Sequence, residues 1–324
     1  MKYIVDIFVA LGERLASFGC DERSNRIIDE AIAANGWFTR VDILRAVGAI
    51  CSEMLEREAL EKWLNNYTPS VQSKRVAVIM AGNIPLVGFF DLLCVLVAGH
   101  ECHVKPSSKD SVLMRYIIEQ LRDIDADIAI YDYSADVAYD MAIATGGDDA
   151  NRYFREHFAN TRTLLRGSRH SVAVLNGAES AEELRALYND VTAYSGLGCR
   201  SVSMLFVPQG YVPTFERGVA QNVKLRRNVQ AMRATLAIEG VEFFDAGAFI
   251  MRRGDDFVQS LAVVTLKEYS DIESVNSWIE ANAEHIQCVV SNCAIEYSCP
   301  LGRAQYPALV DYADGVDTMR FLLD

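Results

Sequence analysis

The sequence of 324 residues has no lysine-rich or arginine-rich block to offset its net charge of −13. That charge opposes non-specific attraction to nucleic acids and to anionic membrane surfaces. We therefore expect no nucleic-acid partner. No stretch approaches the ~18 consecutive apolar residues that a spanning helix requires, so we also predict no membrane span.

Cysteine pairs with the spacing C-x-x-C are absent, although the chain has eight cysteines. The chain is too long for a small domain held together by disulfides, and we expect the cytoplasm to keep its thiols reduced. A buried thiol that packs as a small hydrophobic group is the ordinary interpretation of each cysteine. We apply that interpretation to Cys288, Cys293 and Cys299, which have no histidine partners in the sequence.

Metal-ligand patterns are equally scarce. His100 and His103 flank Cys102, but neighbouring residues of a strand point to opposite faces. Three ligands on both faces of a strand do not form a coordination shell, and we predict no metal site.

The N-terminal residues 1–19 contain an apolar stretch, but charged residues interrupt it and no small-residue cleavage site follows a clean apolar core. We therefore expect a cytoplasmic protein without an export signal. The apolar residues recur at helical spacing, which predicts an amphipathic helix. They are Ile4, Ile7, Phe8, Leu11 and Leu15.

Residues 1–66 have the pattern of several helices. Asp21 precedes one helix, Asn35 ends it, and Thr39 or Asp42 can cap the next. The pattern then changes to short strands that alternate with helices. We predict strands at 75–80, 101–105, 127–131 and 142–145, and helices at 86–98, 110–121 and 149–158.

A second alternating pattern follows. Its predicted strands are 171–175, 203–207 and 261–266, and its predicted helices are 180–194, with a capping box from Ser180 to Glu183, 211–236 and 271–283. Strands that alternate with helices indicate βαβ units and parallel sheets. We predict an α/β protein with two domains: 1–163, the helical lead-in and a parallel-sheet dinucleotide-binding domain, and 164–324, a second α/β catalytic domain with a C-terminal tail.

Two glycine-rich turns follow predicted strands of the first domain, Ala81-Gly82-Asn83 and Thr145-Gly146-Gly147. Ligands of parallel sheets bind at the carboxyl ends of strands, where such turns let the backbone come close. Each turn is either a cofactor contact or an ordinary loop, and the pattern alone leaves both open.

Cys199 lies between a predicted helix and a predicted strand, directly after Gly196 and Gly198. Glycines there allow a sharp turn that can aim backbone N–H groups at a developing oxyanion. Arg200 would favour the thiolate, because a nearby cation lowers the pKa of a thiol. The alternative is a structural cysteine in a tight turn, and the motif does not decide between the two.

Four phrases, taken in order and spacing, resemble the aldehyde dehydrogenase superfamily. The branch resembled is that of the bacterial acyl-CoA reductases related to the fatty acid reductase subunit of luminescence systems. The similarity runs from about residue 70 to the end and includes Gly302–Gln305 and Asp311–Asp317. The four phrases are Ala81–Val87, Val104–Ser108, Ala144–Gly147 and Gly196–Arg200.

The resemblance implies an aldehyde-dehydrogenase-like fold and a role for each matched residue. Cys199 matches the catalytic cysteine, and Asn83 matches the asparagine whose amide stabilises the oxyanion of the thiohemiacetal. Lys105 matches a lysine that contacts the adenosine ribose, while Thr145 and Gly146 match the turn near the cofactor phosphates. The implied cofactor contacts are Gly82, Lys105, Ser107, Ser108, Thr145, Gly146 and Gly147.

Two departures from the family bear on the chemistry. Leu165 stands where aldehyde-oxidising members have the glutamate that activates hydrolytic water. Since leucine accepts no proton, the thioester would persist, which favours reduction. Ser108 stands where NAD-preferring members have a glutamate, so a 2′-phosphate is not repelled and Lys109 can attract it. We therefore expect NADPH, with NADH as the alternative.

These implications lead to an acyl-CoA or acyl-carrier-protein reductase that forms a fatty aldehyde through an acyl-cysteine. His170 is a candidate proton donor, although a structural histidine is its ordinary interpretation. The alternatives are an acyl-transfer subunit that carries the acyl group on Cys199 without hydride transfer, and a non-catalytic scaffold. An acyl-activating partner enzyme and a homodimer are left open. A possible acyl tunnel, more simply core, involves Leu86, Phe89, Phe90 and Leu93.

Overall fold

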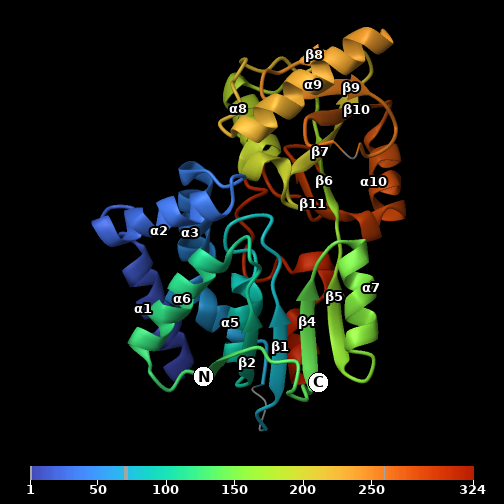
Figure 1. Ribbon diagram of the computed structural model, residues 1–324. Helices are drawn as coiled ribbons and strands as arrows, with labels where there is room; N and C mark the ends of the chain where they lie inside the picture. The colour runs from blue at the N-terminus through green and yellow to red at the C-terminus, as the bar shows by residue number, and fades with distance from the viewer. Residues whose placement is uncertain (1, 69–71, 259) are drawn as a thin grey trace. The chain divides into compact units, whose positions relative to one another are not determined.

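The computed structural model describes residues 2–68, 72–258 and 260–324 (Figure 1). Its contacts divide the chain into two compact units. The first unit extends to Ser168 and includes Tyr306–Asp324, and the second comprises Arg169–Gln305. The sequence-based division at 163 assigned the C-terminal tail to the second domain, whereas the contacts group that tail with the first unit.

The first unit is built on a five-stranded parallel sheet with the strand order β3-β2-β1-β4-β5 (Figure 1). This arrangement confirms the predicted fold class. The fifth strand was not predicted, because its sequence has arginine at both ends and only a short apolar centre. The strands are β1 (Arg75–Ile79), β2 (Glu101–Lys105), β3 (Ile130–Asp132), β4 (Met141–Thr145) and β5 (Arg162–Arg166).

Alternate residues of β1 face two apolar layers, as the two-residue period of a strand requires. Val76 and Val78 belong to a large core formed with the helices of one face, and Ala77 and Ile79 belong to a smaller cluster with Phe158, directly after α7. The helices are α1 (Lys2–Leu15), α2 (Glu22–Ala34), α3 (Arg40–Met54), α4 (Arg57–Leu64), α5 (Phe89–Val97), α6 (Ser111–Ile124), α7 (Asp148–His157) and α11 (Thr318–Leu323).

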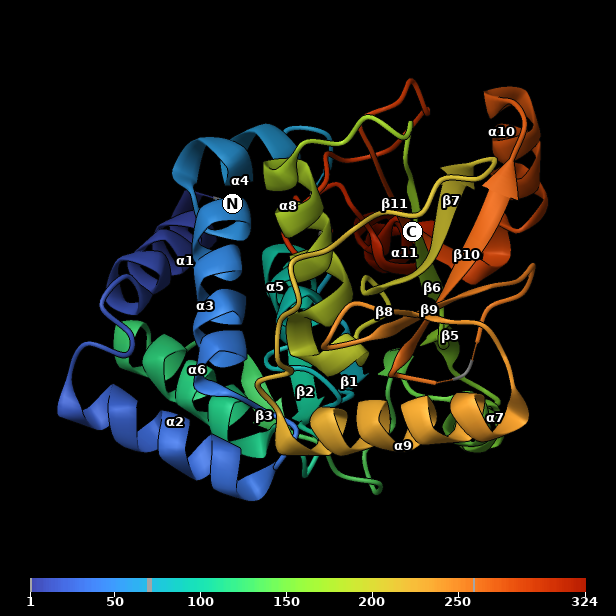
Figure 2. The ribbon, with the colours of Figure 1, turned by 90° about the horizontal axis from the view of Figure 1, so that it is seen from above.

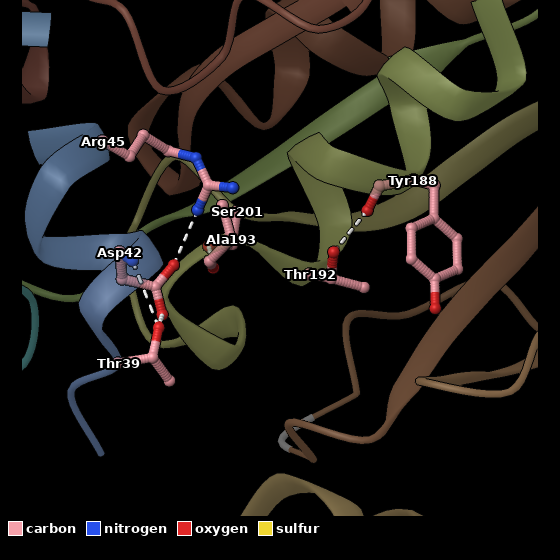
Figure 3. Close-up of polar contacts among 7 residues, drawn as sticks. All are labelled: Thr39, Asp42, Arg45, Tyr188, Thr192, Ala193 and Ser201. Carbon is pink, nitrogen blue, oxygen red and sulfur yellow. Dashed lines mark hydrogen bonds and ion pairs between the residues drawn. The ribbon is translucent and has the colours of Figure 1, made fainter. Parts of the chain in front are cut away.

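Capping side chains explain where the N-terminal helices begin. The Asp21 carboxylate accepts a hydrogen bond from Ser24 N at 2.9 Å, and Thr39 Oγ1 accepts one from Asp42 N at 3.1 Å. Asp42 also accepts from Arg45 at 2.6 Å (Figure 3). Both predicted caps are therefore present, at the starts of α2 and α3. Helices α1, α3 and α4 pack on one another (Figure 2).

The C-terminal tail joins the first unit through a polar network that includes Tyr312 and Asp317 of the Asp311–Asp317 phrase. The Tyr312 hydroxyl accepts from Trp63 Nε1 at 2.8 Å and also bonds the Tyr67 hydroxyl. Tyr67 in turn donates to Asp317 at 2.9 Å. Two hydroxyls and an indole N–H thus satisfy one another in a half-buried position.

The second unit contains a six-stranded sheet with the order β11-β6-β7-β10-β9-β8, in which only the β8–β9 pair is antiparallel. Figure 2 shows β7 and β10 side by side. The strands are β6 (His170–Val174), β7 (Val202–Pro208), β8 (Phe244–Asp245), β9 (Ile250–Arg253), β10 (Val263–Tyr269) and β11 (Ile286–Ser291), and the helices are α8 (Ala181–Thr192), α9 (Val223–Glu239) and α10 (Ile272–Ala281).

One predicted helix of this unit is wrong over its first half. Residues 211–220 have no regular structure, and α9 begins only at Val223, where Asn222 caps it. Pro213 and Gly218 interrupt the earlier segment, because proline lacks an N–H and glycine weakens a helix. The capping box of Ser180 and Glu183 is present as predicted.

Among the described residues, none of the helices combines the length and the apolar character that crossing a membrane requires.

Candidate active site

The loop that carries Cys199 has a strained backbone directly ahead of the cysteine. Tyr194, Ser195 and Gly196 are consecutive residues with φ of 52°, 58° and 76°. A left-handed conformation costs a non-glycine residue about 1–2 kcal/mol. The glycines indicated a sharp turn, but sequence reasoning missed that Tyr194 and Ser195 share it. Strain of this kind gathers at functional sites, where the surrounding structure maintains it.

Hydrogen bonds within the second unit hold this loop. Ser201 N donates to Gly198 O at 2.9 Å, and Ser201 Oγ donates to Ala193 O at 3.4 Å (Figure 3). Thr192 Oγ1, at the end of α8, donates to Tyr188 O at 2.8 Å (Figure 3). The two bonds of Ser201 therefore close the loop on itself, while the Thr192 bond lies within α8.

Cys199 itself is half-buried and contacts residues at the start of β6. Its Sγ accepts a hydrogen bond from Arg169 N at 3.5 Å, and its carbonyl accepts one from Ser171 Oγ at 2.8 Å. An N–H directed at sulfur stabilises the charged thiolate. Sequence reasoning missed this contact, because a backbone donor leaves no side-chain signature.

Arg200 contacts a turn near the end of the second unit, and its effect on the Cys199 thiol stays a prediction. Its Nη1 donates to Ala304 O at 3.3 Å. Asp190, only 1% exposed, accepts from Gly302 N at 2.5 Å and from Ala304 N at 3.1 Å. The Gly302–Gln305 phrase is therefore a turn that Asp190 and Arg200 hold within the second unit.

Two cysteines that are far apart in the sequence meet in this unit. Cys288 Sγ lies 3.6 Å from Cys299 Sγ. Backbone bonds fix the approach, since Cys299 N donates to Val289 O and Ser291 N donates to Cys299 O, both at 2.9 Å. The hydrogen bond from Cys299 and burial raise the pKa of the Cys288 thiol. Their separation carries no motif, so the sequence indicated only isolated thiols.

His170 makes contacts that suit a structural histidine. Its Nδ1 lies 3.2 Å from Ser203 Oγ, and its ring stacks on Phe257 with centroids 4.2 Å apart. Burial lowers its pKa, with a smaller contribution from His285. Its role as a proton donor stays a prediction.

In the first unit, the predicted cofactor residues lie at one edge of the sheet. β1 stands between β2 and β4, so the turns at Gly82, Ser107 and Gly146 follow the carboxyl ends of three neighbouring strands. A Cβ on Gly82 would lie 2.6 Å from Ser107 Oγ, and one on Gly146 would lie 2.7 Å from Ala150 Cβ. These two positions require glycine for close packing.

The other predicted contacts at this edge face outward. Lys105, Ser108 and Lys109 are exposed, and Gly147 has open space where a Cβ would be. Lys105 Nζ lies 5.4 Å from the ring centre of Tyr133, where a cation is attracted to the aromatic face. The edge therefore offers cations and accessible backbone to an anionic ligand.

Two buried polar side chains that sequence reasoning missed hold the turn of Asn83. Asn35 Nδ2 donates to Gly82 O at 3.3 Å, and Asp110 Oδ2 accepts from Leu86 N at 2.7 Å. Leu86 has φ of 58°, a conformation that costs about 1–2 kcal/mol. Burial raises the pKa of Asp110 to about 8, although the Leu86 bond opposes the shift.

This raised pKa predicts a pH dependence of stability. The unfolded carboxyl ionises near 3.8 and the folded one near 8. Between these values only the unfolded state loses the proton, so the free energy of unfolding should fall as pH rises from 4 to 8 and stay level above. The loss is on the order of 5 kcal/mol. Urea unfolding should show that Asp110→Asn removes this slope; an unchanged slope in the variant would contradict the assignment.

The remaining candidates have structural surroundings. Leu86, Phe89 and Leu93 are buried in the large core, and Phe90 packs its ring against Trp63, which fits core rather than tunnel. His100 and His103, the histidines that flank Cys102, bond Leu322 O at 2.9 Å and stack on the ring of Tyr131, respectively. Among the described residues, no group of three or more histidine, cysteine, aspartate or glutamate side chains is placed to hold a metal.

Comparison with known proteins identifies one matching family, described as acyl-CoA reductase (LuxC), whose model covers residues 33–230. A long-chain acyl-protein thioester reductase of Photorhabdus laumondii is 19% identical over 82% of this chain and 55% of its own length. The protein of the same name from Vibrio harveyi is 21% identical over 82% of this chain and 56% of its own. The chain thus spans about half the length of these relatives.

Solved structures share the fold. Aldehyde dehydrogenase 21 from Physcomitrella patens has a TM-score of 0.60 at 12% identity, over 90% of this chain and 73% of that one. An NAD+ complex of aldehyde dehydrogenase from Bacillus cereus has a TM-score of 0.61 at 14% identity, over 89% and 71%. At these identities the likeness shows the architecture alone.

Proposed function

The chain belongs to the acyl-CoA reductase (LuxC) family, and from that premise we propose that it reduces a fatty acyl thioester to an aldehyde through an acyl-cysteine on Cys199. The observation that carries the proposal is the strained loop that presents Cys199 with the Arg169 N–H directed at its sulfur. The relatives named as acyl-protein thioester reductases support a thioester substrate. We propose acyl-CoA or acyl carrier protein as the donor.

In the proposed reaction, the Cys199 thiolate attacks the carbonyl carbon of the thioester and forms a C–S bond. In the proposal, the Cys199 backbone N–H stabilises the tetrahedral oxyanion, and the resemblance implies the same role for the side-chain amide of Asn83. The oxyanion then collapses, the bond to the carrier sulfur breaks, and the carrier leaves as a thiol after taking a proton. The product of this half-reaction is the acyl-cysteine.

The acyl-cysteine is proposed to persist because no side chain at position 165 can activate water. Leu165 lies in β5 and packs, half-buried, in the apolar cluster around Phe158. An apolar group there neither accepts a proton nor holds a water molecule. Reduction therefore takes precedence over hydrolysis.

A nicotinamide dinucleotide would supply the hydride when bound. The carboxyl edge of the first sheet fits such a group, since Gly147 leaves open space and Lys105 and Lys109 are exposed cations. Backbone N–H groups at a glycine turn and exposed lysines suit phosphates. We propose NADPH before NADH, because Ser108 does not repel a 2′-phosphate and Lys109 attracts one.

The test uses purified protein, dodecanoyl-CoA and NADPH. Loss of NADPH absorbance is expected together with an intact-mass increase of one dodecanoyl group, mapped by peptide analysis to Cys199. An adduct without NADPH oxidation, also with NADH and with dodecanoyl-loaded acyl carrier protein, would replace the proposal by an acyl-transfer subunit. If neither signal appears with any of these donors, the reductase and the acyl-transfer proposals are both refuted.

A further inference from the structure

The turn between β1 and α5 carries Asn83 and is held at both ends by buried polar side chains. On one side is Asn35, the residue that ends α2 and is 6% exposed. Its Nδ2 donates to Gly82 O at 3.3 Å while its Oδ1 accepts from Trp37 N at 3.1 Å. Because both ends of the amide are used, its orientation is fixed.

On the other side is Asp110, at the start of α6 and 2% exposed. Its Oδ2 accepts from the N–H of Leu86, the residue of this turn with positive φ. Its own N–H donates to Ser107 O at 3.0 Å, which fixes the residue against the neighbouring turn. Leu86 therefore keeps its left-handed conformation against a fixed acceptor.

Packing alone does not explain a buried aspartate at position 110. Its Oδ1 is buried and has no hydrogen-bond partner among the described residues. Buried polar atoms are nearly always paired, and each exception requires an explanation. Asp110 does not cap α6 with its side chain either. Among the described residues, the hydrogen bond that this carboxyl accepts comes from the turn of Asn83.

We propose that Asn35 and Asp110 are positioning residues that hold Asn83 in the orientation its oxyanion role requires. The inference rests on the proposed function of Asn83. A misplacement of about 1 Å can slow an enzymatic step by as much as ~10²-fold. Asp110→Ala and Asn35→Ala are therefore expected to slow acylation of Cys199 by about 10-fold to 100-fold. Asp110→Asn keeps an acceptor for Leu86 N–H and should restore a rate close to wild type.

The decisive measurement is the rate of Cys199 acylation by dodecanoyl-CoA, followed by rapid quench and intact mass, in wild-type and Asn83→Ala backgrounds. If the two residues act through Asn83, Asp110→Ala should slow the Asn83→Ala enzyme by less than about twofold, because the effects share one partner. Gln120→Ala, which removes another buried polar side chain from α6, is the matched control and should change neither rate.

Three other outcomes would overturn the proposal. Equal losses in both backgrounds would show a general structural role, and no loss from either alanine variant would show that the contacts are idle. If Asn83→Ala itself acylates at the wild-type rate, Asn83 has no catalytic role and Asn35 and Asp110 are not positioning residues. The proposed chemistry of Cys199 is unaffected by that result. Should Asp110→Ala not fold, Asn35→Ala in both backgrounds gives the same test.

Discussion

Replacing Cys199 with alanine is expected to abolish the acyl adduct and to slow aldehyde formation by roughly 10⁴-fold or more, the scale at which removal of an enzyme nucleophile acts. Without the sulfur, no covalent intermediate divides the reaction into two steps. Asn83→Ala should keep the adduct but form it about 10²-fold to 10³-fold more slowly, as for loss of one oxyanion donor. The two variants therefore differ in the presence of the adduct and not only in rate.

The measurement combines NADPH oxidation with intact mass after incubation with dodecanoyl-CoA. Cys293→Ala is the matched control, since Cys293 is another half-buried thiol of the second unit, and it should behave as wild type. Cys199→Ser tests the thiol itself: a hydroxyl in the same loop is far less acidic, so turnover should fall nearly as far as in alanine. A persistent adduct in Cys199→Ala would show that another cysteine is the nucleophile.

The fold was largely predictable because its signals are local. The apolar run of Val76 to Ile79 and the caps at Asp21 and Thr39 depend on residues close in the sequence, and all three appear in the structure. Four strands were not predicted, namely β5, β8, β9 and β11. β5 and β11 have short apolar centres that resemble loops. These two strands form because they pair with β4 and β6, and a local sequence pattern does not show such pairing.

The candidate site was less predictable for the same reason. Short sequence motifs identify Cys199 and the glycine turns, but the residues that hold them in place are distant in the sequence. Arg169 reaches Cys199 with a backbone N–H, and Asp110 reaches Leu86 across 24 positions. Asp190 likewise meets Gly302 across 112 positions. Such partners become visible only when the chain is folded.

The second large effect is expected at the buried ion pair of the first unit. Arg166 Nη1 lies 2.5 Å from Asp91 Oδ1, and Arg166 Nη2 donates to Thr318 Oγ1 at 2.7 Å. The pair thus connects β5, α5 and α11. Burial raises the pKa of Asp91, and Arg166 opposes that shift. Removing one partner leaves an uncompensated buried group, so Arg166→Met should lower the free energy of unfolding by about 3–5 kcal/mol.

Two further results follow from the same physics. Without Arg166 the pKa of Asp91 rises further, and the folded state must keep its carboxyl protonated. The destabilisation by Arg166→Met should therefore grow as pH rises from 5 to 8. The double variant Asp91→Leu with Arg166→Met removes both desolvation costs and should regain more than half of the loss. Urea unfolding at the two pH values measures all three proteins. Additive losses in the double variant would show that the two groups act independently, and a loss below about 1 kcal/mol for Arg166→Met would show that solvent reaches the pair.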